Sequence, residues 1–264
     1  MHRVVLTSAI LLTLLALIGC GNGSSSTPSQ SSLTTPTPSA TPIMQAAMAS
    51  IANNGLNQSF TISGYVGYLT QTGPNETFSG SGSLSLPPAV QTTLNGGAVL
   101  SETQTITLQE TITYDGTGTV SSTTYLDPSN YTIVAQTSPF AGAPSGYFVY
   151  APYSYPSTDQ AGDTGTLATG TIYSDSTMAN QIGTFKLTYS VAAGSANSLQ
   201  VTFAWLYANS TSPGDQITYQ VDSNGNATLL TYVNDGTAIP CMAGSSTVAA
   251  CASVAPETFT YTFQ

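Results

Sequence analysis

Residues 199–207 read LQVTFAWLY, and this stretch decides the fold class. Its large apolar side chains occupy every second position: Leu199, Val201, Phe203, Trp205 and Tyr207. Gln200, Thr202 and Ala204 stand between them. A period of two is typical of a strand with one face against a core and the other toward water.

The same alternation recurs along most of the chain. Residues 185–191 and 258–263 repeat it, and serines fill one side of a third stretch at positions 79, 81, 83 and 85. Turn pairs such as Asn95-Gly96 and Asn224-Gly225 separate the segments. The pattern predicts an all-β fold, an antiparallel sandwich or barrel of about a dozen strands. One short N-terminal helix is expected, because Met44, Met48 and Ile51 share a helical face.

Composition excludes several classes of function. Charged residues make up 5% of the 264 positions, with 2 cations, 12 carboxylates, 42 Thr and 34 Ser. Nucleic-acid binding needs clusters of Lys and Arg to neutralise phosphates, so no nucleic-acid partner is expected. Hydroxyl groups replace charges on the polar strand faces. Such a protein protects its strand edges by closing or covering the sheet, or it self-associates. Closure is favoured, and self-association stays open.

The N-terminus carries an export signal. Residues 4–17 form an apolar stretch behind Arg3, too short for a confident membrane span. The stretch ends in Leu17-Ile18-Gly19-Cys20, which resembles the lipobox of bacterial lipoproteins. The resemblance covers the first twenty or so residues and implies cleavage before Cys20, with lipid on its thiol. The membrane is then the expected partner of Cys20.

The expected organisation has three parts. Residues 1–19 are the signal peptide, 20–43 a disordered Ser/Thr/Pro tether, and 44–264 a β-rich domain. Ile112-Thr113-Tyr114 and Ile217-Thr218-Tyr219 each lead into a Gly-containing turn, and this weak repeat suggests two related halves, about 56–140 and 146–264. Chance matches are the alternative, because Thr and Tyr are common in these segments. Retention in the inner membrane is associated with Asp after the lipidated cysteine. Gly21 stands there, so the expected location is the outer membrane.

The remaining cysteines and the missing histidine limit the chemistry. Cys241 and Cys251 lie ten positions apart in a chain expected to be exported, which predicts a disulfide. His2 leaves with the signal peptide, so the mature chain has no histidine for a catalytic triad or a His-based zinc site. No metal and no cofactor are expected.

Catalysis by carboxylates alone is compatible with this composition, which includes 12 Asp and Glu residues. A glycoside hydrolase needs two acids, and Glu102 and Glu110 are candidates. Glu110 follows Ile106 and Leu108 on the apolar face of its segment, so we expect a carboxylate pointing inward there. An inward carboxylate has a raised pKa, which suits a general acid, whereas a bulge would turn it outward.

Aromatic residues supply the candidate for ligand binding. Four tyrosines crowd one proline-containing segment: Tyr147, Tyr150, Tyr153 and Tyr155. Exposed rings would stack on sugars or anchor a partner, whereas buried rings would belong to the core. The sequence therefore favours a membrane-anchored module of the cell envelope that is structural or binds a partner. A carbohydrate-binding module and a carboxylate-dependent glycoside hydrolase are the alternatives, with a glycan or an envelope protein as the partner.

Overall fold

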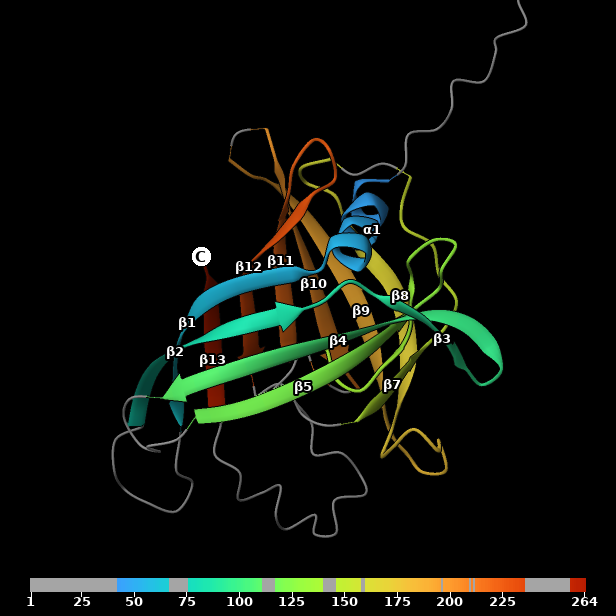
Figure 1. Ribbon diagram of the computed structural model, residues 1–264, viewed down its shortest axis with the longest axis horizontal. Helices are drawn as coiled ribbons and strands as arrows, with labels where there is room; N and C mark the ends of the chain where they lie inside the picture. The colour runs from blue at the N-terminus through green and yellow to red at the C-terminus, as the bar shows by residue number, and fades with distance from the viewer. Residues whose placement is uncertain are drawn as a thin grey trace, which may run out of the picture. The chain divides into compact units, whose positions relative to one another are not determined.

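A computed structural model describes residues 42–66, 76–110, 117–139, 146–157, 160–195, 197–208, 210, 212–235 and 257–264. Within them the chain forms one helix and thirteen strands in a single antiparallel sheet (Figure 1). The elements are α1 Ile43–Asn54, β1 Leu56–Val66, β2 Glu76–Leu86, β3 Val90–Leu94, β4 Gly97–Glu110, β5 Thr117–Leu126, β6 Ile133–Gln136, β7 Tyr147–Tyr150, β8 Thr164–Tyr173, β9 Gln181–Ala193, β10 Leu199–Tyr207, β11 Asp215–Val221, β12 Ala227–Asp235 and β13 Glu257–Phe263.

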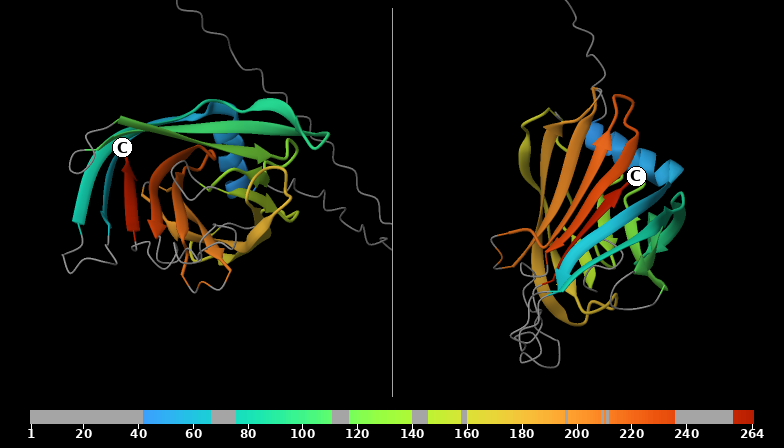
Figure 2. Two further views of the ribbon diagram at one scale, coloured as in Figure 1. Left: turned by 90° about the horizontal axis from the view of Figure 1, so that it is seen from below. Right: turned by 90° about the vertical axis from the view of Figure 1, so that its left-hand side faces the viewer.

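The sheet closes on itself into a 12-stranded barrel with β3 outside it. Strands follow one another around the barrel in chain order, and two further pairings complete the circle. Strand β1 pairs with β13, in a register that places Phe60 opposite Phe263, and β2 pairs with β4 beyond the short strand β3. Figure 2 shows β13, in red, beside β1. Closure resolves the choice between sandwich and barrel, and it pairs the edges that a sandwich would leave free.

Alternation sorts the side chains between the inside and the outside of the barrel, as predicted. In β2 the four serines at 79, 81, 83 and 85 are exposed, whereas Leu84 and Leu86 are buried. In β9 Phe185 and Leu187 are buried and Lys186 is exposed. The apolar rows make one core inside the barrel, and the hydroxyl rows face outward.

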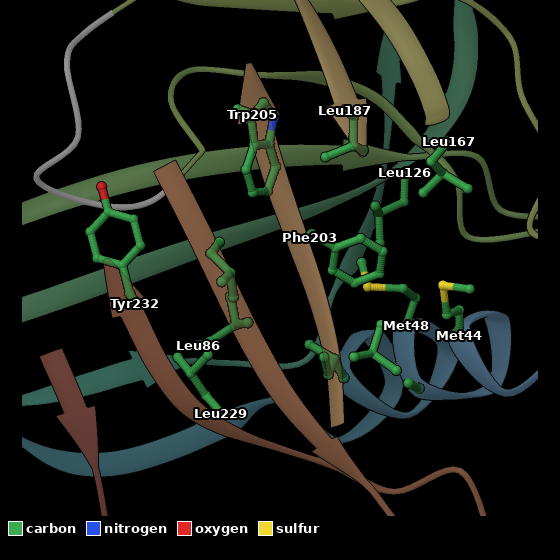
Figure 3. Close-up of a cluster of buried hydrophobic side chains, with 14 of the residues drawn as sticks. Met44, Met48, Leu86, Leu126, Leu167, Leu187, Phe203, Trp205, Leu229 and Tyr232 are labelled. Atoms are coloured by element: carbon green, nitrogen blue, oxygen red, sulfur yellow. The ribbon is translucent and has the colours of Figure 1, made fainter. Parts of the chain in front are cut away.

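The predicted helix exists and covers one end of the barrel. Met44, Met48 and Ile51 of α1 are buried against strand side chains, and Figure 3 shows Met48 near Phe203 of β10. The helix ends at Gly55, whose backbone N–H donates to the Ile51 carbonyl at 2.7 Å. A Cβ at Gly225 would lie 2.7 Å from Cβ of Ala46, so glycine permits the β11–β12 turn to approach α1.

The turn chemistry also follows the sequence. Asn95 and Gly96 join β3 to β4 with φ of 51° and 84°, the positive values that a two-residue hairpin turn requires. No helix in the described residues is long and apolar enough to cross a membrane.

Several predictions fall outside the described residues. They are the signal peptide, almost all of the tether, Cys20, Cys241 and Cys251. Residues Ala40–Gln264 form one compact unit. The two related halves stay a prediction, because part of the suggested repeat at 112–114 also lies outside what is described.

Candidate functional site

A cavity of about 60 Å³ lies inside the barrel, next to α1. One side of its wall is apolar and comes from α1, β8, β9, β10 and β11: Met48, Ile51, Leu167, Leu187, Phe203, Trp205 and Ile217. The other side is polar and comes from β4, β5 and β6: Glu102, Gln104, Ser122, Thr124 and Gln136. Figure 3 labels three of these apolar residues, Leu187 of β9 and Phe203 and Trp205 of the neighbouring strand β10. The lining is completed by Leu86, Ile133, Pro139, Tyr153, Tyr155 and Tyr219, so three tyrosines also border the cavity. The cavity therefore has a mostly polar wall beside a largely apolar one.

Strand register places three residues of the polar wall in one row. Glu102 pairs with Thr124, and Thr124 pairs with Gln136, so the three occupy neighbouring positions on β4, β5 and β6. Residues that are directly opposite each other in a sheet point to the same face. With strands about 4.8 Å apart, the Cα atoms of Glu102 and Gln136 are about 10 Å apart.

Two atoms of this row are buried without a hydrogen-bond partner among the described residues. They are Oε1 of Glu102 and Nε2 of Gln136, on side chains that are 5% and 1% exposed. An unpartnered buried polar atom costs about 1–3 kcal/mol, so such atoms are uncommon in folded proteins. Burial also raises the pKa of Glu102 from 4.5 to about 7, because the charged carboxylate loses its hydration.

The four tyrosines of the sequence prediction lie in or beside the core. Tyr147 and Tyr150 are buried in β7, and the indole N–H of Trp205 donates to the hydroxyl of Tyr150 at 2.7 Å. Tyr153 and Tyr155 line the cavity. The hydroxyl of Tyr153 accepts from the Ile133 N–H, and that of Tyr155 donates to the Tyr131 carbonyl, each at 2.9 Å.

The rings do not form a flat platform. The planes of Tyr150 and Tyr153 meet at 43°, and those of Tyr153 and Tyr155 at 78°. Burial raises the pKa of Tyr153 to about 12, so its hydroxyl stays protonated near neutral pH. A ligand-binding role for the tyrosines stays a prediction, and the cavity wall is where Tyr153 and Tyr155 would meet a ligand.

The inward carboxylate predicted on β4 has a described counterpart at Glu102. Glu110 pairs through its backbone with Gly80, and its side chain lies outside what is described. The prediction for Glu110 therefore stays open. Glu102 occupies the same face by alternation, two positions before Gln104 and four before Ile106, and it is buried.

A second buried carboxylate was not singled out from the sequence. Asp215, at the start of β11, is 0% exposed and accepts three hydrogen bonds. The donors are the hydroxyl of Tyr207, the hydroxyl of Tyr232 at 2.5 Å and the amide of Asn234 at 2.9 Å. Burial raises the pKa of Asp215, and the three donors oppose that rise. The sequence gives no indication that Asp215 is buried, because it follows Pro213 and Gly214 and resembles a turn residue.

An open groove of about 700 Å³ crosses the barrel over β7–β10. Its lining includes Lys186, Thr169, Thr171 and Thr184, beside the rings of Tyr150 and Phe185. Lys186 is the one lysine of the chain. The groove thus offers hydroxyl groups and one ammonium to a partner.

The lining of the cavity bears on the glycoside hydrolase alternative. Among the described residues, Glu102 is the one carboxylate that lines the cavity. A glycoside hydrolase would need a second acid about 5–9.5 Å away. The described part of the chain also holds no group of three His, Cys, Asp or Glu residues that could bind a metal ion.

Comparisons with known proteins give little further guidance. No protein-family model and no curated protein matches the chain. A structure assigned as an outer membrane lipoprotein-sorting protein domain from Vibrio parahaemolyticus aligns over 84% of this chain and 89% of its own, at 10% identity. The TM-score is 0.18, a value that does not establish a common fold.

Proposed function

We propose that this protein is an exported lipoprotein, held at a membrane of the cell envelope by lipid on Cys20. The β-barrel serves there as a binding module rather than as an enzyme. The outer membrane is the proposed location, and an envelope protein or a glycan the proposed partner.

The main support for lipid anchoring is the sequence Leu17-Ile18-Gly19-Cys20 at the C-terminal end of the apolar stretch 4–17. Residues 20–43 then supply a long Ser/Thr/Pro spacer before α1 begins at Ile43. A tether of this kind would hold a folded domain tens of ångströms from a bilayer, which is useful to a protein that acts at a membrane surface.

Two features of the barrel support a binding role. The groove over β7–β10 is large enough to receive part of a partner, and it places the one lysine of the chain there. Serine rows on the outside, as in β2, give a neutral polar surface that can hydrogen-bond to sugars or to protein. Among the described residues the cavity wall has one carboxylate, Glu102, which argues against a two-acid hydrolase at that site.

The first prediction tests the anchor. Cys20→Ser should move most of the protein from the membrane fraction to the soluble fraction, because stable anchoring needs the acyl chains. Asn22→Ser is the control, since it introduces a serine two positions away and leaves both Cys20 and the predicted Cys241–Cys251 disulfide intact. Membrane fractionation and intact-mass measurement of both variants give the result. An unmodified Cys20 in wild-type protein that still partitions with membranes would refute the proposal.

A further inference from the structure

We propose that the barrel cavity is a ligand site for a small neutral molecule that carries an amide group on an apolar body. This inference goes beyond the anchored module and does not depend on the lipid. It rests on the size of the cavity, on its two unlike walls and on the two unpartnered atoms of the polar wall.

Cavity size sets the size of the ligand. A water molecule needs about 10–15 Å³ of cavity volume, counted as the space open to its centre, so a cavity of 60 Å³ has room for about four waters. Four waters take up about 120 Å³ of liquid. A compact organic molecule of about six non-hydrogen atoms fills a similar space.

The polar wall sets the head group. Nε2 of Gln136 is a donor that lacks an acceptor, and Oε1 of Glu102 is an oxygen that lacks a donor. An amide supplies both, because its carbonyl accepts from Gln136 while its N–H donates to Glu102. An ammonium group has no acceptor, so Nε2 of Gln136 would stay without a partner. A carboxylate would be buried beside Glu102, and no Lys or Arg of the described residues lines the cavity.

The apolar wall sets the body of the ligand. Leu187, Phe203 and Ile217 offer no hydrogen-bonding groups, so this side favours a branched hydrocarbon over water. Water molecules alone could satisfy Glu102 and Gln136, but they would face these side chains without partners. A molecule with both a polar and an apolar end matches the two walls together.

Trp205 provides the readout. It is the only tryptophan of the chain and it lines the cavity, so tryptophan emission, excited at a wavelength where the 15 tyrosines absorb little, reports on that site. The probes are isobutyramide and 3-methylbutan-2-one, which have the same shape and differ by an NH₂ in place of a CH₃. The full-length chain is titrated with each probe at pH 7, with N-acetyltryptophanamide as a control for quenching in solution.

We expect saturable binding of isobutyramide, with a Kd at least tenfold lower than that of the ketone. Glu102→Leu should remove this preference, because the NH₂ that distinguishes the two probes donates to Glu102. Gln136→Leu should weaken the binding of both probes, because both carry the carbonyl that accepts from Gln136. Gln181→Leu, a matched change on an exposed residue, should leave both the affinity and the preference unchanged. Equal binding of the two probes overturns the amide assignment. No binding of either, or a crystal soaked in isobutyramide that shows only ordered water between Glu102 and Gln136, overturns the ligand site. The wild-type comparison decides the matter if Glu102→Leu or Gln136→Leu does not fold.

Discussion

Asp215 and Glu102 are two carboxylates buried in one barrel, and they differ in how many hydrogen bonds they accept. Asp215 receives hydrogen bonds from Tyr207, Tyr232 and Asn234, on the strands that flank β11. Glu102 faces the cavity, and its Oε1 has no partner among the described residues. Burial raises the pKa of both. Burial and pKa therefore do not separate a structural carboxylate from a ligand-facing one, whereas the number of donors does.

The largest expected effect comes from removing the satisfied carboxylate. Asp215→Ala would leave the donors of Tyr207, Tyr232 and Asn234 buried without an acceptor, which should lower the free energy of unfolding by about 3–5 kcal/mol. Urea unfolding measures the loss. Asp175→Ala, on an exposed turn, is the control and should cost far less. A small loss at Asp215 would mean that the three donors find other partners.

The second effect concerns pH and Glu102. Its pKa is about 7 in the folded protein and 4.5 as a reference, so the folded state binds the proton more tightly. The associated stability is fully present below about pH 4.5 and is lost as pH rises through about 7. The shift corresponds to roughly 3 kcal/mol.

Glu102→Gln tests this dependence, because glutamine cannot ionise. The variant should be more stable than wild type at pH 8, and the two should be similar at pH 4. Asp215 keeps its own contribution of the same sign in both proteins, so the difference between the two profiles is the quantity to measure. Parallel profiles of unfolding free energy against pH would contradict the raised pKa of Glu102.

The smallest effect on stability should come from replacing Gln136, whose Nε2 has no partner among the described residues. Gln136→Leu removes an Nε2 that donates no hydrogen bond to any described residue, so the unfolding free energy should change by less than about 1 kcal/mol. Gln58→Leu is the matched comparison, because Gln58 exchanges two hydrogen bonds of 3.0 Å with the backbone of Leu229. That variant should lose about 2 kcal/mol. Equal losses in thermal or urea unfolding would show that Gln136 is partnered after all.

Much of the fold could be predicted from the sequence, because its signals are local. Alternation in residues 199–207 and the serines at 79–85 gave the strands, and Met44, Met48 and Ile51 gave the helix. Closure is favoured because the polar strand faces carry few charges, and the closed barrel confirms it. Which strands close the circle could not be predicted, because that depends on the register between strands at the two ends of the chain. Sequence alternation alone leaves barrel and sandwich equally open.

The site was predictable only in part, for the same reason. Alternation puts Glu102 on the inner face of its strand, so a buried carboxylate on β4 could be expected. Gln136 lies on a strand of four residues, too short to show a period, and its place beside Thr124 appears only in the pairing of β5 with β6. Asp215 depends on donors from two neighbouring strands, which no local pattern reveals.

Chain-order pairing has a consequence for how the barrel folds. Almost every pairing joins strands that are close in sequence, so the meander can grow by short steps that cost little loop entropy. The closing seam is different, because it joins Phe60 to Phe263, near the last residue of the chain. The circle cannot close until Glu257–Phe263 has arrived. If the chain crosses a membrane N-terminus first, as the proposed export requires, the barrel can therefore close only after residues 257–263 have crossed.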